Sequence, residues 1–124
     1  MMSYQIHDDL NLVYVKTSGH VTYDDRVAIV RDLLNRVQTE GSRAILIDHQ
    51  EARINTDLQE AYDFGKVVAR LGTKESALEI LVVASGDNRL SVDVSATVAA
   101  SSGVQLRVCE DREEAFAKIF QNLM

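Results

Sequence analysis

The stretch Ala44-Ile45-Leu46-Ile47-Asp48-His49 decides the fold. Its four apolar residues stand in a row, which is the pattern of a strand buried on both faces of a parallel sheet. Ile80-Leu81-Val82-Val83-Ala84 repeats the pattern and leads into the turn-forming residues Ser85-Gly86-Asp87-Asn88. We therefore predict two central strands, the first ending at Asp48-His49 and the second ending before Ser85.

One helix is predicted before the first of these strands in the sequence, and another helix is predicted after it. Before it, apolar residues recur at the spacing of one helix face, at Val27, Val30, Leu34 and Val37. This helix is predicted to begin with Thr22 as its N-cap and to stop at Gly41. After the strand, Thr56 is the predicted N-cap of a second helix, and Gly72 lies just past its end.

The C-terminal third predicts a helix, a strand and a final helix. Residues 89–100 fit either a strand or a helix, and the cap-like Asn88 before them and Gly103 after them favour a helix. Alternating apolar residues then predict a short strand over 104–108. Asp111 is the predicted cap of the last helix.

The N-terminal residues predict a β-hairpin. Two short alternating segments, at 4–6 and 12–15, flank the polar cluster at 8–11, and Gly19 closes the second strand. Strands that alternate with helices imply parallel pairs joined by right-handed crossovers. The predicted fold class is α/β: a single domain over residues 1–124 with an N-terminal β-hairpin followed by β-α units. Its sheet is mixed, mostly parallel and five-stranded, and it has four helices.

Composition narrows the classes of function. The 124 residues include 13 Lys and Arg against 19 Asp and Glu, a formal charge of −6, which argues against nucleic acid and anionic membranes as partners. No apolar run approaches the roughly 18 residues of a membrane span. One cysteine excludes a disulfide scaffold and a Cys-rich zinc site, and it fits a reducing, cytoplasmic location.

Polar side chains follow the predicted strands, at the rim where open α/β sheets bind ligands. They form a candidate site for a small ligand, beside helix N-termini that suit an anion: Asp48, His49, Ser85, Asp87 and Cys109. Neighbours in a strand point to opposite faces, so Asp48 and His49 do not form an acid–base pair. The histidines lack metal-ligand spacing, and Ser85 lacks the glycines of a nucleophile elbow. We therefore predict no catalytic residue, no metal and no cofactor.

The order of elements, together with several segments, resembles a known family. The segments are Ser3-Tyr4-Gln5-Ile6, Leu12-Val13-Tyr14-Val15 with Gly19, Ala44-Ile45-Leu46-Ile47-Asp48, and Val108 with Asp111-Arg112-Glu113-Glu114-Ala115-Phe116. The chain resembles the STAS fold, which groups anti-sigma-factor antagonists with the cytoplasmic domains of sulfate transporters. More specifically, it resembles the SpoIIAA-like proteins of bacteria. The resemblance implies a regulatory module that binds a protein partner and is not an enzyme.

The resemblance also implies a site at the start of the second helix, where anti-sigma-factor antagonists carry a phosphorylated serine, usually after an aspartate. Here the residues are Asn55-Thr56-Asp57. If Asn55-Thr56 aligns with that pair, the hydroxyl is kept and the preceding carboxylate is lost. If Thr56-Asp57 aligns, Asp57 stands where the serine would be. In both cases the phosphoserine motif is incomplete, and Thr56 also fits a simple N-cap.

Three functions remain open from the sequence. A protein-interaction module would dock its partner around Thr56, and a homodimer would form through the exposed first strand or a helix face. A small-ligand module, for an apolar or anionic molecule, would need a cavity on the order of several hundred Å³ between helix and sheet. An enzyme would need Asp48, Ser85 and Cys109 to converge on one point. We rank the protein-interaction module first and the enzyme last.

Overall fold

The structure, a computed structural model, describes residues 2–9, 12–40, 44–72 and 78–123. Its strands are β1 (Ser3–Asp9), β2 (Leu12–Val21), β3 (Ala44–Ile54), β4 (Glu79–Val83) and β5 (Leu106–Cys109). Its helices are α1 (Tyr23–Glu40), α2 (Leu58–Gly72), α3 (Arg89–Ala100) and α4 (Arg112–Leu123), with a short 3-10 helix, η1 (Gly86–Asn88), before α3. The ambiguous residues 89–100 are therefore helical, as predicted. The predicted helix stop at Gly41 and part of the first turn, residues 10–11, lie outside the described residues.

The strands lie side by side in chain order, β1-β2-β3-β4-β5. β1 pairs with β2 antiparallel, which is the predicted hairpin. The parallel part of the sheet has four strands, because β2, β3, β4 and β5 pair in the same direction. The α/β class and the β-α units that follow the hairpin are confirmed.

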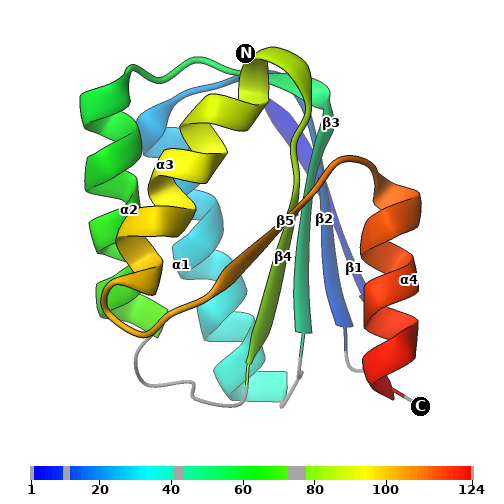
Figure 1. Ribbon diagram of the computed structural model, residues 1–124. Helices are drawn as coiled ribbons and strands as arrows, with labels where there is room; N and C mark the ends of the chain where they lie inside the picture. The colour runs from blue at the N-terminus through cyan, green and yellow to red at the C-terminus, as the bar shows by residue number, and fades with distance from the viewer. Residues whose placement is uncertain (1, 10–11, 41–43, 73–77, 124) are drawn as a thin grey trace.

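Helices cover both faces of the sheet. Figure 1 shows α1, α2 and α3 on one face and α4 alone on the other. Side chains alternate between two cores, because successive residues of a strand point to opposite faces. Ile45 and Ile47 of β3 belong to the core under α1, α2 and α3, whereas Leu46 belongs to the core under α4. This burial on both faces explains the unbroken apolar run of β3.

Three strands are longer than predicted. β1 includes Asp8 and Asp9, which the sequence predicts to lie in the turn, because they pair with Val13 and Leu12 of β2. The sequence predicts that β3 ends at Asp48-His49, but the strand continues to Ile54 because β2 runs beside it as far as Val21. β4 leaves β3 earlier, at the pair of Asp48 with Val83. The prediction that Gly19 closes β2 is also wrong, since Gly19 lies inside the strand with a φ of 79°.

Asn88 does not cap α3. Its side chain makes no cap hydrogen bond, although the sequence predicts that role. Instead, its Oδ1 accepts the Ile54 N–H at 2.8 Å, and its Nδ2 donates to the carbonyls of Ala52 at 2.9 Å and His49 at 3.3 Å. These three backbone groups belong to the part of β3 beyond the point where β4 leaves it.

Two helices begin where the sequence predicts. At α1, the Asp25 N–H donates to Thr22 Oγ1 at 3.2 Å and the Thr22 N–H donates to Asp25 Oδ2 at 2.9 Å, a reciprocal capping box. At α4, the Glu114 N–H donates to Asp111 Oδ1 at 2.9 Å. The caps Thr22 and Asp111 are therefore confirmed.

The second helix begins one residue later than predicted. Asp57, not Thr56, is its cap: the Glu60 N–H donates to Asp57 Oδ1 at 2.8 Å, and the Asp57 N–H donates to Glu60 Oε1 at 3.1 Å. Thr56 instead shares a hydrogen bond of 2.5 Å with the Ser91 hydroxyl on α3. Gly72, predicted to lie past the helix, is its last residue.

Candidate functional site

Asp48 and His49 lie at an irregular point of the sheet. Lys16 pairs with Asp48 but Ser18 pairs with Glu51, so β3 has one more residue than β2 between these pairs. Such a bulge re-aims the side chains around it. The two side chains enter different cores, with Asp48 on the α4 face and His49 on the face of α1, α2 and α3. The predicted opposite orientation of the pair is confirmed.

Asp48 is the centre of a hydrogen-bond network that ties α4 to the sheet. Its side chain is fully buried, and its oxygens accept hydrogen bonds from the Tyr14 hydroxyl at 2.6 Å, the Gln50 N–H at 2.9 Å and Arg112 Nε at 2.8 Å. The Tyr14 ring stacks on Phe116 of α4 with ring centroids 5.4 Å apart. Burial and the Asp48 carboxylate raise the pKa of Tyr14 to about 12. Asp48 is therefore a structural anchor.

His49 is a neutral imidazole of defined tautomer. Thr17 Oγ1 donates its one proton to the Asp48 carbonyl at 3.1 Å, so it accepts from His49 Nδ1 at 2.7 Å. Nδ1 then carries the ring proton and Nε2 is the acceptor nitrogen. Burial and the nearby Arg26 cation lower the pKa of His49 to about 3. The ring therefore carries no charge at neutral pH.

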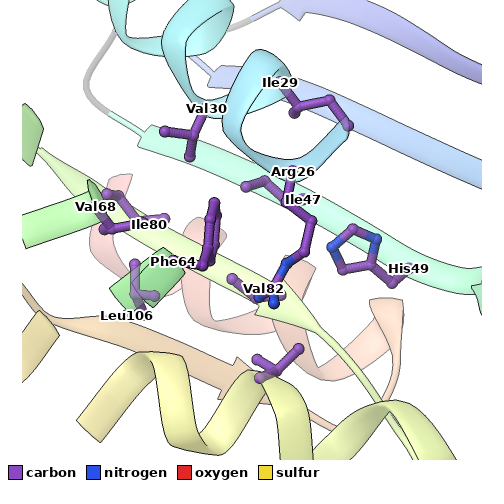
Figure 2. A pocket seen from close by; sticks show the side chains of 11 residues that line it. Arg26, Ile29, Val30, Ile47, His49, Phe64, Val68, Ile80, Val82 and Leu106 are labelled. Atoms are coloured by element: carbon purple, nitrogen blue, oxygen red, sulfur yellow. The ribbon is translucent and has the colours of Figure 1, made fainter. Parts of the chain in front are cut away.

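Arg26 of α1 is a buried cation, which the sequence analysis missed. Its side chain is 4 % exposed, and its guanidinium carbon lies 4.0 Å from the centroid of the Phe64 ring. Its Nε and Nη1 are buried and have no hydrogen-bond partner in the part of the chain that the structure describes. Burial lowers the pKa of Arg26 to about 10, so the group is still protonated at neutral pH. Figure 2 shows the side chain descending from α1 between the Phe64 and His49 rings.

The sequence did contain a signal for Arg26. The buried stripe of α1 consists of Arg26, Ile29, Val30, Leu33, Leu34 and Val37, at helical spacings of three and four. A charged residue at the first position of this stripe must face the sheet. The predicted stripe began instead at Val27, which is only half-buried.

A small cavity lies beside Arg26 and His49, between the sheet and the three helices. Its volume is about 20 Å³, which is room for about one water molecule. Nine apolar side chains complete its wall: Ile29, Val30, Ile47, Phe64, Val68, Ile80, Val82, Val92 and Leu106. We call this space the Arg26 cavity. It is far smaller than the several hundred Å³ typical of a site for an organic ligand.

A larger hollow lies elsewhere, on the outer surface between α1 and α2. This groove has a volume of about 410 Å³ and is lined by Arg31, Leu34, Asn35, Gln38, Arg70 and Leu71. It is separate from the rim predicted from the sequence.

The predicted rim residues do not form one site. Ser85 is half-buried, Asp87 is exposed, and Cys109 is a buried free thiol whose pKa is raised by burial. Asp48 and Cys109 are both in register with Val83, so they stand two strands apart, at about 10 Å. Among the described residues, no hydrogen bond joins any two of Asp48, Ser85 and Cys109.

Three large hydrophobic side chains are exposed near the N-terminal ends of α2 and α3, two helices that pack against each other. Leu58 is 58 % exposed, Tyr62 is 42 % exposed and Leu90 is 62 % exposed. Leu58 and Tyr62 are one turn apart on α2. Leu90 precedes Ser91 on α3, and the Ser91 hydroxyl shares a hydrogen bond with the Thr56 hydroxyl just before α2. We call these three residues the apolar patch. Asn55, Thr56 and Asp57, the predicted partner site, lie directly before it, and the Asn55 N–H donates to the Val21 carbonyl at 2.7 Å.

Comparisons with known proteins identify the fold. No family model and no curated protein matches the sequence. The anti-sigma factor antagonist SpoIIAA in its unphosphorylated form superimposes with a TM-score of 0.60 at 13 % identity, over 94 % of this chain and 97 % of that one. An anti-sigma factor antagonist from Mycobacterium paratuberculosis superimposes with a TM-score of 0.67 at 15 % identity, over 95 % and 93 % of the two chains.

A third solved structure agrees with these two. An uncharacterised protein from Shewanella loihica, described as having a SpoIIAA-like fold, matches with a TM-score of 0.51 at 18 % identity, over 94 % of this chain and 91 % of that one. The chain therefore has the SpoIIAA-like fold that the sequence suggested. Within the described ranges, no helix is both long enough and apolar enough to cross a membrane.

Proposed function

We propose that this SpoIIAA-like chain is a non-enzymatic interaction module that docks a partner protein on the apolar patch of Leu58, Tyr62 and Leu90. The observation that carries the proposal is the exposure of these side chains, which are the large hydrophobic residues left exposed in the described part of the chain. Exposed apolar side chains that lie together on a soluble domain are typical of an interaction surface.

The surroundings of the apolar patch suggest the chemistry of the partner. Asp57 and Asp87 are exposed and flank the patch in sequence, while Glu60 is half-exposed within it. The whole chain carries a formal charge of −6. The patch also carries cations, since Lys66 Nζ lies 4.7 Å from the centroid of the Tyr62 ring and Arg89 is next to Leu90 in the chain. We infer that the partner offers an apolar centre with charged side chains of both signs around it, since complementary charge speeds association and sets specificity.

The regulatory part of the proposal draws on the structural relatives. Two of them are anti-sigma factor antagonists. If Asp57 aligns with the phosphorylated serine, its carboxylate caps α2; if Thr56 aligns with it, the hydroxyl is engaged by Ser91. We therefore propose docking that does not depend on a phosphoserine at this position.

The internal geometry favours docking over the two other functions. The Asp48 carboxylate is occupied by three donors and the Cys109 thiol is buried with a raised pKa, which suits neither a general base nor a nucleophile. The Arg26 cavity, at about 20 Å³, is too small to enclose an organic ligand of ordinary size and admits at most one small ion or a single carboxylate group. A buried free cysteine also fits the cytoplasmic location that we propose.

The experiment that tests the proposal compares two double variants as baits. Leu58→Ser with Leu90→Ser removes most of the apolar patch, and Asn35→Ser with Gln38→Ser makes the same number of serine substitutions on exposed positions of α1. Proteins captured from a lysate of the native host are identified by mass spectrometry, and the best candidate is purified. Calorimetric titration of that protein should give a Kd at least tenfold weaker for the patch variant and an unchanged Kd for the α1 variant.

Two outcomes separate a partner protein from self-association. If the patch variant turns a dimer into a monomer in sedimentation velocity, a second copy of this chain occupies the patch. If the patch variant and the α1 variant bind every captured protein equally, the apolar patch is not the docking surface and the proposal is wrong.

A further inference from the structure

We propose that the Arg26 cavity binds a small monovalent anion, which pairs with the buried guanidinium. The candidate ligands are a halide ion or the carboxylate of a short acid. This site is separate from the apolar patch and plays no part in the proposed docking.

The buried guanidinium of Arg26 lacks a counter-charge. Arg26 is 4 % exposed and remains protonated at neutral pH, yet its buried Nε and Nη1 have no hydrogen-bond acceptor among the described residues. A buried charge without a partner is strongly unfavourable, and breaking such a pair is among the most costly changes in a protein. The Phe64 ring under the guanidinium compensates only part of this cost.

The described residues supply no anion that pairs with Arg26. No carboxylate among them forms an ion pair with Arg26, and burial is the one cause of its lowered pKa. Asp48, next to His49 in the chain, points to the opposite face and is held by Arg112 and Tyr14. His49 is neutral, and its protonated Nδ1 is bound to Thr17.

The size and lining of the Arg26 cavity suit a small anion. About 20 Å³ admits one particle of about the size of a water molecule, which suits a halide ion or the oxygen of a carboxylate better than a phosphate or a sulfate. Apart from Arg26 and His49, the wall is apolar. An apolar wall strengthens the attraction between the guanidinium and an anion, because the local dielectric constant is low.

The experiment measures the thermal stability of the purified chain in sodium gluconate, whose anion is too large for the cavity. Chloride, bromide, formate, acetate and butyrate then replace gluconate at constant ionic strength. A bound anion raises the ratio of folded to unfolded chain by the factor one plus its free concentration over Kd. We expect a saturable rise of the melting temperature with at least one of these anions.

Matched variants assign the effect to the cavity. Arg26→Met should abolish the response, and it should leave the stability in gluconate unchanged or raised, because it removes an unpaired buried charge. Arg31→Met, on the exposed side of the same helix and in the surface groove, should keep the response. If only halides raise the melting temperature, the ligand is a free inorganic ion. If the rise increases from formate to butyrate, the ligand is the carboxylate group of an acid with an apolar chain.

The line width of the chloride NMR signal tests the site without a variant. If the ligand is a halide, the wild-type chain should broaden the signal and bromide should reverse the broadening; if it is a carboxylate, the short acid that stabilises the chain should do so with no chloride broadening. The proposal is overturned if no anion stabilises the chain more than gluconate does, since the cavity then holds water alone. It is also overturned if Arg26→Met keeps the response or if Arg31→Met removes it.

Discussion

At the scale of single residues, His49 makes the stability of the fold sensitive to acid. Its pKa is lowered from 6.5 to about 3 in the folded state. Between pH 6.5 and pH 3, His49 is therefore protonated in the unfolded chain but not in the folded chain. Lowering the pH over this range decreases the stability of the fold. The stabilisation is complete above pH 6.5 and is lost as the pH falls towards 3, at about 1.4 kcal/mol for each pH unit.

We expect His49→Gln to flatten this pH dependence by the equivalent of one proton. Urea unfolding of both chains at pH 7, 6 and 5 gives the slopes, and His20→Gln, at an exposed position, is the control. Equal slopes for wild type and His49→Gln would show that His49 is protonated in the folded chain as well.

The environment of these residues was beyond prediction from the sequence. The alternation along a strand predicts correctly that Asp48 and His49 point to opposite faces. The partners of Asp48, Tyr14 and Arg112, lie 34 and 64 residues away in the chain. Those contacts depend on which strands and helices become neighbours, and no local pattern carries that information.

At the scale of elements, the sequence predicted the order and type of every strand and α-helix that the structure describes, but not all their ends, and the 3-10 helix η1 was predicted as a turn. Thr56 and Asp57 can both cap a helix, and local propensity does not choose between them. The choice follows from β3, which continues to Ile54 beside β2. Thr56 is then placed beside Ser91 of α3, and Asp57 becomes the first residue free to cap α2.

The contact between α2 and α3 depends on the absence of a side chain at Gly65. A Cβ at this position would lie 2.7 Å from the Ser95 carbonyl oxygen and 2.7 Å from Val98 Cβ. We expect Gly65→Ala to lower the free energy of unfolding by about 1–3 kcal/mol through overpacking. This loss should exceed the gain of about 1 kcal/mol that alanine brings to a helix interior.

Denaturant unfolding measures the effect, and Gln59→Ala, on the exposed side of α2, should stay within about 0.5 kcal/mol of wild type. A Gly65→Ala chain as stable as wild type would mean that the two helices separate at little cost.

At the scale of the whole molecule, the alternation of apolar runs and capped helices was enough to predict the layered architecture. β3 and β4 are central because they are apolar on both faces, and α4 covers the face opposite the other three helices (Figure 1). The apolar patch and the Arg26 cavity were not predicted. Both arise where helices from distant parts of the chain meet each other or the sheet.

Asn88 covers part of an open edge of the sheet. Where β4 departs, the last residues of β3 have a strand on one side alone, and unpaired backbone groups on a strand recruit strands from other chains. The Asn88 amide occupies three of those groups and so takes the place of a neighbouring strand.

Asn88→Ala should lower the free energy of unfolding by about 2–3 kcal/mol, for three lost hydrogen bonds. It should also cause self-association that increases with concentration in sedimentation velocity, whereas Asn55→Ala, at an exposed position near the end of β3, should not. A variant that stays as monodisperse as wild type would show that β3 is protected by other means. If the expected result holds, one amide side chain limits aggregation at a site where most proteins need a charge, a proline or a covering helix.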